Sequence, residues 1–440
     1  MKNNLRKLMS FPINTNMELQ LPKGTRDFSP EEKILRDKIV NTLKEVFELY
    51  GFAPLDTPIL EKFDVLASKY AGGAEILKET FKLKDQGGRD LGLRYDLTVP
   101  LARYVGMNPN MKMPFKRYQI GEVFRDGPVG SARYRQFLQC DVDVIGSSSM
   151  AADAEIVTLI YMAFSKLNFE VIVKVNNRRL LNDILDYCGV EKDKQEAVIL
   201  SIDKLEKFGM NVVKNELKEQ KIDDKKINKI MDIINIKGSD EQKISQLKNL
   251  LKDSKGLIEI EQLISCLKNL NFNAEFDLSL ARGLAYYTGT VIETFLKNSN
   301  VKSSVCAGGR YDGIIGAFLG KGNYPAVGVS FGVDRIYDAL LEKLETKKKT
   351  NTQVYVVPIK TLNESSKIAQ QLREAGIKTD IDANDKSPSK NLEYANSLGI
   401  PYVVFVGKKE LEENKVKLRD MKSGKEEMLR IEEVMKKLKE

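Results

Sequence analysis

Two β-rich runs on either side of a turn-rich loop constrain the fold of this chain most strongly. The runs are Phe115 to Arg125 and Arg133 to Ile145, and the loop between them is Asp126-Gly-Pro-Val-Gly-Ser-Ala132. This pattern predicts a long antiparallel hairpin. Because side chains alternate between the faces of a strand, one face of the second run is apolar. Its other face carries polar and aromatic side chains, namely Arg135, Phe137, Gln139, Asp141 and Asp143.

That polar face has two interpretations. In a lone strand it would usually be a solvated outer face. Here the partner run brings Arg125 to the same end of the hairpin, beside the loop. Two paired strands that gather Arg, Gln and Asp side chains form a polar floor, and such a floor can hold a zwitterionic or phosphorylated ligand.

The pattern changes several times along the 440 residues, a length too great for a single core. A capped helix is predicted from Ser29-Pro-Glu-Glu32 to Gly51. After Asn351 a β-α-β-α-β order predicts a small α/β domain. We therefore expect an α+β fold, with an antiparallel sheet flanked by helices, a helical insertion and a C-terminal α/β domain. The expected boundaries are a main domain in two parts at 1–175 and 271–345, an insertion at 176–270, and the last domain at 346–440.

The composition excludes several kinds of chemistry. The chain has no histidine, so a Ser-His triad, a histidine-ligated metal and an imidazole base are all excluded. Its four cysteines form no CxxC pair, so no zinc site is expected. The net charge of +8 permits an RNA partner without showing one. No run is long and apolar enough for a membrane span, and Met1 to Gln20 does not resemble a secretory signal, so we expect a cytoplasmic protein without membrane contact.

Three later segments combine reactive side chains with glycines. We expect strands at Phe276 to Phe295 and Pro325 to Val333, the first of which carries Leu280-Ala-Arg-Gly-Leu-Ala-Tyr-Tyr-Thr-Gly289. The paired glycines in Cys306-Ala-Gly-Gly-Arg-Tyr-Asp-Gly313 suit either close approach of a ligand or a plain tight turn. Val327 to Arg335 predicts a strand that enters a helix, with the arginine near the helix start.

Together these segments resemble the class II aminoacyl-tRNA synthetases in order and spacing. Leu55-Asp-Thr-Pro58 resembles motif 1, Phe124-Arg125 with the loop and following strand resembles motif 2, and Gly328 to Arg335 resembles motif 3. Arg282 to Gly289 and Ala307 to Gly313 closely match the two histidine-specific peptides of histidyl-tRNA synthetases. Leu93-Arg-Tyr-Asp-Leu-Thr98 and Arg133-Tyr-Arg-Gln-Phe137 are similar to that family too. The resemblance spans the chain from Leu21 to the C-terminal domain.

The resemblance implies a ligase that activates L-histidine with ATP and then loads it onto tRNA-His. Arg125 and Arg282 resemble the arginines that contact the ATP α-phosphate, and Arg335 resembles the one that binds the γ-phosphate. Guanidinium groups would stabilise the negative charge that grows as the histidine carboxylate attacks. Mg²⁺ would bridge phosphates and assist departure of pyrophosphate, although no metal-ligating residue is expected from the sequence.

The resemblance also implies a histidine pocket. Asp96, Thr98 and Gln139 match positions that hold the α-amino group. Asp143 and Tyr287 match positions that face the imidazole, with Tyr286 and Tyr311 close by. A carboxylate and a phenol suit a ring with one donor and one acceptor. Two departures remain: some family members have Glu in place of Asp96 and Asp143, and strict alternation would place Tyr286, rather than Tyr287, on the face of Arg282.

The family further implies a homodimer and a C-terminal anticodon-binding domain. Three alternatives remain open. A histidine-sensing regulatory paralogue on the same fold would typically lack the last domain and the arginines. A synthetase for another amino acid would not need the histidine-specific peptides, and a pure RNA-binding protein would not need the three arginines.

Overall fold

The computed structural model describes residues 19–67, 77–130, 134–282, 286–319, 322, 324–344 and 348–439. The chain divides into two compact units, which are considered separately. The first consists of Met1–Asp27 and Leu43–Ile336, and the second of Phe28–Thr42 and Tyr337–Glu440. Among the described residues, no helix combines the length and the apolar character that a membrane crossing requires.

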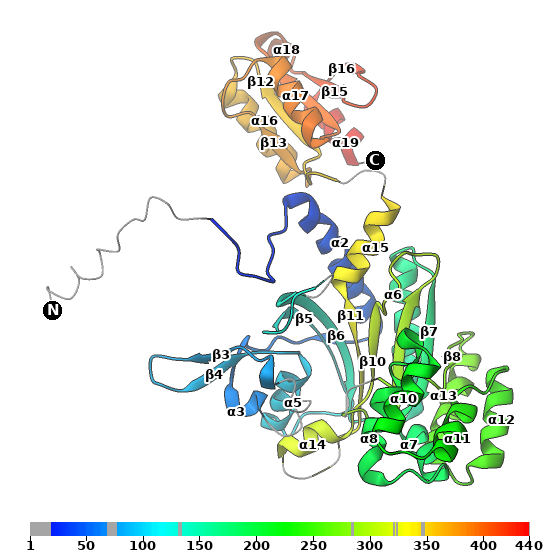
Figure 1. Ribbon diagram of the computed structural model, residues 1–440. Coiled ribbons are helices and arrows are strands. Elements are labelled where there is room, and N and C mark those ends of the chain that lie inside the picture. Colours follow the sequence, from blue (N-terminus) through cyan, green and yellow to red (C-terminus); the bar gives the residue numbers. More distant parts are fainter. Residues whose placement is uncertain are drawn as a thin grey trace, which may run out of the picture. The chain divides into compact units, whose positions relative to one another are not determined.

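A large mixed sheet is the centre of the first unit (Figure 1). Over the described ranges it contains eight strands, in the spatial order β1 (Ala53–Pro54), β5 (Phe115–Phe124), β6 (Gln136–Ile145), β11 (Ala326–Gly332), β10 (Cys306–Arg310), β9 (Thr290–Leu296), β7 (Val171–Asn177) and β8 (Glu275–Phe276). The strands pair antiparallel except at the two edges, where β1 and β8 pair parallel to their neighbours. The expected antiparallel sheet is therefore confirmed.

The predicted hairpin is formed by β5 and β6. They pair along their whole length, from Phe115 opposite Ile145 to Phe124 opposite Gln136. Residues 131–133, which belong to the predicted loop and to the start of the predicted second strand, lie outside the described residues. The hairpin places Gln139, Asp141 and Asp143 along one face, as the alternation of the strand requires.

Helices cover the opposite, apolar face of this sheet. Phe47, near the end of α2 (Pro30–Leu49), packs against Tyr118 and Phe331 with ring centroids 5.4 and 5.6 Å away. Phe164 of α6 (Met150–Lys166) contacts the same Phe331 ring at 5.8 Å. The helix start predicted at Ser29 is confirmed, because the Ser29 and Glu32 side chains accept hydrogen bonds from each other's backbone N–H.

Smaller elements complete the first unit. A three-stranded sheet has the order β2 (Leu60–Lys62), β4 (Asp90–Leu93) and β3 (Lys82–Lys84) among the described residues. The helices beside it are α3 (Phe63–Leu66), α5 (Thr98–Met107) and α14 (Gly313–Leu319). The segment predicted as mostly helical is confirmed as α7 (Arg178–Tyr187), α8 (Lys192–Ile202), α9 (Leu205–Phe208), α10 (Met210–Glu219), α11 (Asp224–Ile234), α12 (Asp240–Leu250) and α13 (Lys255–Asn269).

The strand predicted from Phe276 to Phe295 is wrong in its first part. Only β8 and β9 are strands, and the chain between them is irregular where it is described. The buried Asn176 amide donates to the backbone carbonyls of Leu278 and Leu280, so these groups bond to a side chain instead of to a neighbouring strand. Arg282 adopts a φ of +42°, a conformation that ends strand alternation. Residues 283–285 lie outside the described part of the chain.

The second unit contains the predicted β-α-β-α-β order. Its elements are β12 (Val354–Pro358), α16 (Leu362–Glu374), β13 (Thr379–Ile381), α17 (Pro388–Leu398) and β14 (Tyr402–Val406). β12 lies between β13 and β14 and is parallel to both, and fully buried valines of β12 and β14 form part of its core. The chain continues through α18 (Lys408–Glu412), β15 (Val416–Asp420), β16 (Glu426–Leu429) and α19 (Ile431–Lys439), which the sequence analysis did not predict. The helix that contains Arg335 is α15 (Val333–Lys343).

Candidate active site

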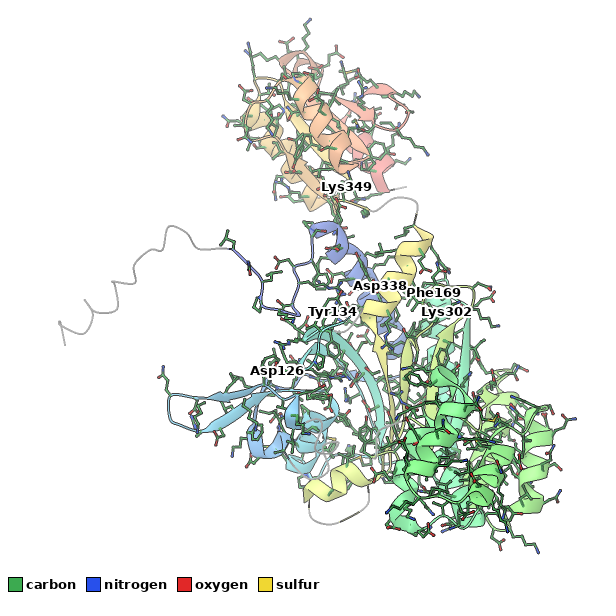
Figure 2. All side chains as sticks on the ribbon, viewed as in Figure 1. Asp126, Tyr134, Phe169, Lys302, Asp338 and Lys349 are labelled. Carbon is green, nitrogen blue, oxygen red and sulfur yellow. The ribbon has the colours of Figure 1, made fainter. Side chains whose placement is uncertain are left out.

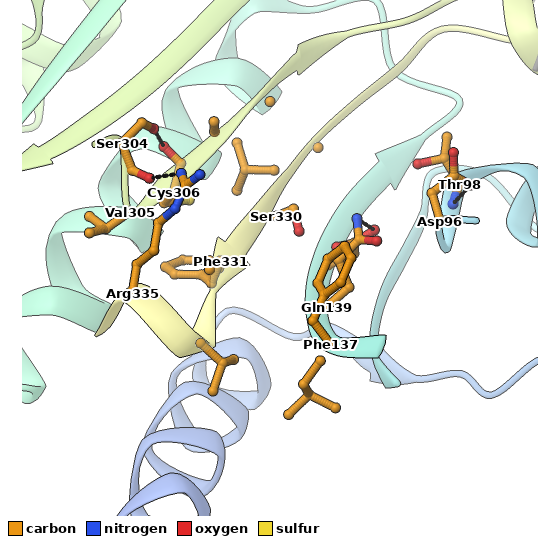
Figure 3. Close-up of a pocket in the computed structure, with 18 of the residues that line it drawn as sticks. Asp96, Thr98, Phe137, Gln139, Ser304, Val305, Cys306, Ser330, Phe331 and Arg335 are labelled. Atoms are coloured by element: carbon orange, nitrogen blue, oxygen red, sulfur yellow. Dashed lines mark hydrogen bonds between the residues drawn. The ribbon is translucent and has the colours of Figure 1, made fainter. Parts of the chain in front are cut away.

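A cavity of about 730 Å³ opens on the polar face of the large sheet. Its lining includes every side chain that the sequence analysis named as a site residue: Asp96, Thr98, Arg125, Gln139, Asp143, Arg282, Tyr286, Tyr287, Tyr311 and Arg335. Figure 3 shows Asp96 and Thr98 at one end and Arg335 beside Ser304 at the other, with Gln139 and Ser330 between them. The cavity therefore has a carboxylate end and an arginine end.

Asp143 is held firmly at the carboxylate end. Its Oδ1 accepts a hydrogen bond from the Tyr311 hydroxyl, and its Oδ2 lies 2.8 Å from Nη2 of Arg117. Arg117 lies directly opposite on β5 and is completely buried. Burial raises the pKa of Asp143, and the neighbouring Arg117 opposes this effect. Both carboxylate oxygens therefore have fixed neighbours before any ligand binds.

Gly328 makes room for this carboxylate. It faces Asp143 across the β6–β11 pairing. A Cβ atom at position 328 would lie 2.0 Å from Oδ1 of Asp143, far inside van der Waals contact. The close approach of the carboxylate therefore requires a glycine at position 328. The segment from Gly328 to Arg335 thus contributes to the pocket through a residue without a side chain.

Asp96 is oriented by the start of α5. Its Oδ1 accepts hydrogen bonds from the backbone N–H groups of Thr98 and Val99, at 3.0 and 2.9 Å. Burial raises the pKa of Asp96, while the Val99 N–H and then the Arg125 charge lower it. The helix start thus fixes the direction of a buried acidic group that lines the cavity.

Three tyrosines gather beside these carboxylates. The Tyr286 and Tyr287 rings lie 4.7 Å apart, and Tyr286 meets Tyr311 edge-on at 6.4 Å. Tyr286 and Tyr287 both line the cavity, and neither belongs to a strand whose alternation would separate them. The Arg282 guanidinium lies 5.6 Å from the centre of the Tyr287 ring.

The arginines are held in place by aromatic rings and backbone groups. The Arg125 guanidinium lies 4.3 Å from the ring centre of Tyr95 and 4.9 Å from that of Phe137. Arg335 donates to the backbone carbonyl of Ser304. Arg282 lies 3.8 Å from the Glu293 carboxylate. Such contacts preorganise a planar guanidinium and leave donors available to an anion.

Comparison with known proteins identifies the family. Residues 24–336 match the family model for histidyl-tRNA synthetase, and residues 353–440 match an anticodon-binding domain. The chain belongs to the histidyl-tRNA synthetase family. The sequence-based prediction of a histidine–tRNA ligase, an aminoacyl-tRNA synthetase with this fold, is confirmed.

Individual relatives agree along nearly the whole chain. Histidine–tRNA ligase 1 of Bacillus cereus is 44% identical, with 93% of this chain and 95% of the relative covered. Histidine–tRNA ligase 2 of Shouchella clausii is 41% identical, with 93% and 98% covered. The crystal structure of histidyl-tRNA synthetase from Nostoc matches with a TM-score of 0.86 at 32% identity, covering 96% of this chain and 99% of that one.

One further structure shares the fold alone. A Bacillus halodurans protein described as an ATP phosphoribosyltransferase regulatory subunit/histidyl-tRNA synthetase matches with a TM-score of 0.73 at 22% identity, covering 86% of this chain and 97% of that one. The fold by itself therefore does not separate synthetases from regulatory subunits, and the site must carry that distinction.

The structure adds residues to the site of this synthetase that had no role assigned from the sequence. Tyr95 and Phe137 enclose Arg125, and Ser330 and Asp141 lie on the floor between the two ends. Lys207 of α9 brings a side chain of the insertion to the cavity. The alternation of β6 already placed Phe137 and Asp141 on the polar face predicted from the sequence, without a role for either. Nothing local in the sequence distinguishes Lys207 from the many other lysines of the insertion.

The motif 2 loop of the synthetase begins and ends beside the cavity. Tyr134 lines it and accepts a hydrogen bond from Arg26, whose guanidinium also lies 4.3 Å from the Tyr134 ring centre. Arg135 lies 3.3 Å from the Asp126 carboxylate, so an ion pair connects the residues on either side of the loop. Asp126 and Tyr134 can be followed in Figure 2.

Proposed function

We propose that this cavity is the active site of the histidine–tRNA ligase. There the chain joins L-histidine and ATP into histidyl-adenylate with release of pyrophosphate, and then transfers the histidyl group to the 3′-terminal adenosine of tRNA-His. The observation that carries the proposal is the pairing of acidic and phenolic side chains at one end with Arg125, Arg282 and Arg335 around the same cavity.

The arginines serve the chemistry at the α-phosphate. A carboxylate oxygen of histidine attacks the α-phosphorus, a new P–O bond forms, and the bond to the pyrophosphate oxygen breaks. Negative charge grows on the phosphate oxygens during this step. We assign Arg125 and Arg282 to the α-phosphate and Arg335 to the γ-phosphate. Fixed guanidinium donors stabilise such charge without reorganising during the reaction. Removing one donor of this kind typically costs about 10²- to 10³-fold in rate.

The carboxylate end recognises histidine. We assign Asp96, Thr98 and Gln139 to the α-ammonium group, and Asp143 and Tyr287 to the imidazole, with Tyr286 and Tyr311 completing the wall. A pocket of buried polar groups rejects amino acids that would leave these groups unpaired. Discrimination can therefore occur at binding.

Mg²⁺ is proposed to act with the ATP phosphates. Among the described residues, no group of three or more acidic or cysteine side chains could hold a metal ion by itself. Mg²⁺ commonly binds through substrate phosphates, water and one or two carboxylates. Glu293, beside Arg282, has a suitable donor chemistry for such a carboxylate. When bound, the ion would neutralise phosphate charge and assist pyrophosphate departure.

The wider assembly is proposed from the same family membership. The catalytic parts would be residues 1–175 and 271–345, the insertion 176–270, and the anticodon-binding domain 346–440. We propose a homodimer in which the segment of Leu55 to Pro58 contributes to the interface. Ile59 and Leu60, which follow it, are 42% and 50% exposed and offer apolar surface to a second copy. We assign the reaction to the cytoplasm, as for a synthetase that supplies cytoplasmic translation.

Aminoacylation tests the proposal directly. Purified protein is supplied with histidine, ATP, Mg²⁺ and tRNA-His, and the formation of AMP and of histidyl-tRNA is followed separately. The enzyme should form both products, and Arg282→Ala should abolish AMP formation while the protein still binds histidine. A folded wild-type protein that binds histidine but forms neither product would instead be a regulatory paralogue.

A further inference from the structure

Asp141 lies on the floor of the cavity between two side chains with proposed roles. It follows Gln139 and precedes Asp143 on the same face of β6, and all three line the cavity. Across the sheet it is opposite Gln119 of β5 and Ser330 of β11. Only 4% of Asp141 is exposed. It is therefore a buried acidic group at the centre of the site.

The Asp141 carboxylate is poorly satisfied by the protein. Its Oδ1 has no hydrogen-bond partner among the described residues, and its Oδ2 accepts a long 3.5 Å contact from Nε2 of Gln139. A side-chain hydrogen bond from Ser330 on the neighbouring strand lowers the pKa of this carboxyl. The Oε1 of Gln139 is likewise a buried acceptor that lacks a donor within the described part of the chain. In Asp143 the Oδ2 also makes no hydrogen bond within the described residues, but the Arg117 guanidinium lies 2.8 Å from it, and the Tyr311 hydroxyl donates to Oδ1. Buried unpaired acceptors are costly, so two neighbouring ones call for a ligand with several donors.

The charges around Asp141 also call for a cation. Burial raises its pKa to about 7, and Arg117 opposes the rise while Asp143 adds to it. The other groups that act on it or feel its charge are Ser330, Asp96, Arg94, Tyr311, Cys140 and Cys306. Arg117 acts on the carboxylates of Asp96, Asp141 and Asp143 and already forms an ion pair with Asp143. Arg125 also acts on Asp96, and Arg94, which lies 3.8 Å from the Asp56 carboxylate, interacts with Asp141. A positively charged ligand would complete this balance.

We propose that Asp141 is a further specificity-determining residue of the histidine pocket and accepts a hydrogen bond from the substrate's α-ammonium group. This inference rests on the proposed function of the cavity. An ammonium group carries three N–H donors, whereas a neutral imidazole carries one. Only the ammonium group can satisfy Gln139 Oε1 and Asp141 Oδ1 together. Its charge also compensates the acidic cluster, and charge-assisted bonds are the stronger kind.

The test compares histidine with imidazolepropionate, the same molecule without the amino group. Binding of each to wild-type protein and to Asp141→Asn is measured by titration calorimetry. The lost charge-assisted bond should weaken histidine binding about 10- to 100-fold in the variant. Imidazolepropionate binding should change less than about twofold. Asp193→Asn, an exposed aspartate of α8, is the matched control and should leave both affinities unchanged.

Proton release gives a second readout that needs no variant. At pH 7 the Asp141 carboxyl of the empty site is about half protonated, because its pKa is about 7. An ammonium group bound beside it keeps it charged, so histidine should release about half a proton more than imidazolepropionate. Titrations in buffers of different ionisation enthalpy measure this difference. The imidazole pKa differs between the two free ligands, because only histidine carries the ammonium group, so each free ring is titrated separately and its contribution is subtracted.

Different outcomes would refute the role of Asp141 and the proposed function of the cavity. If Asp141→Asn leaves histidine affinity unchanged, or weakens both ligands equally, Asp141 does not bind the ammonium group. Equal proton release by the two ligands would also overturn the inference. This test uses wild-type protein alone, so it remains decisive even if the Asp141→Asn variant does not fold. Wild-type protein that forms no histidyl-adenylate would refute the proposed function instead, whatever the binding data show.

Discussion

Replacing Gly328 with alanine should displace Asp143 and damage histidine recognition. The new Cβ would lie 2.0 Å from Oδ1 of Asp143 and 2.7 Å from the backbone oxygen of Val142. Ordinary contact begins near 3.4 Å, so the carboxylate would have to retreat by about 1.4 Å, the difference between 3.4 and 2.0 Å. Arg117 lies 2.8 Å from the other carboxylate oxygen and limits that retreat.

A displacement of this size is large for an active site. Misplacement by about 1 Å can cost about 10²-fold in rate, so kcat/KM for histidine in ATP–pyrophosphate exchange should fall by about that factor. KM for ATP should change much less, because the displaced Asp143 is assigned to the imidazole of histidine and not to ATP. Gly87→Ala, in the turn between β3 and β4, is a suitable control, since its Cβ would have the Asp85 and Arg89 side chains of the same turn as nearest neighbours and none closer than 3.3 Å. A folded Gly328→Ala enzyme with kcat/KM for histidine within about twofold of wild type would refute the argument.

Three other perturbations have definite expected results. Arg125→Lys should lower the exchange rate by about 10²-fold, because an ammonium group cannot replace the planar guanidinium held between Tyr95 and Phe137; an unchanged rate would contradict the α-phosphate assignment. Arg310→Met should lower the free energy of unfolding, measured in urea, by about 3–5 kcal/mol, because it leaves the buried Asp153 carboxylate without its ion-pair partner. Adding Asp153→Asn should restore part of the loss. Folding raises the pKa of Asp141 from 3.8 to about 7. Between these two values the folded protein therefore binds more protons than the unfolded protein, so the contribution of Asp141 lowers the free energy of unfolding as pH rises from about 4 to about 7. Thermal melts should therefore show that Asp141→Asn gains stability over wild type from pH 4 to pH 7 and levels off above; a difference independent of pH would show that the folded-state pKa is not raised.

Much of the fold could be predicted because the local sequence patterns favour the same helices and strands that the folded chain forms. The β5–β6 hairpin, the capped helix from Ser29 and the alternating elements after Asn351 each carry strong local signals. The strand prediction was wrong around Leu278 and Leu280 because a long-range contact occupies the backbone there. The Asn176 amide, about a hundred residues earlier in the chain, takes the carbonyls that a strand would have paired. Strand alternation was therefore the wrong guide to Tyr286 and Tyr287.

The candidate site, like the fold, could be predicted only in part. Motif resemblance indicated ten side chains that line one cavity, although their individual roles stay predictions. It could not indicate Arg117, because a buried arginine on a neighbouring strand becomes meaningful only when the register places it opposite Asp143. The reason for Gly328 likewise requires the β6–β11 pairing. Cross-strand neighbours depend on register, and a single sequence specifies register only where a hairpin or a buried face determines it.

ATP–pyrophosphate exchange with each of the twenty amino acids tests the central claim most directly. The claim is that the acidic and arginine ends of one cavity together activate histidine. Exchange should occur with histidine alone, in the presence of Mg²⁺, and Arg282→Ala should abolish it. Exchange with a different amino acid, or no exchange by folded wild-type protein, would contradict the account.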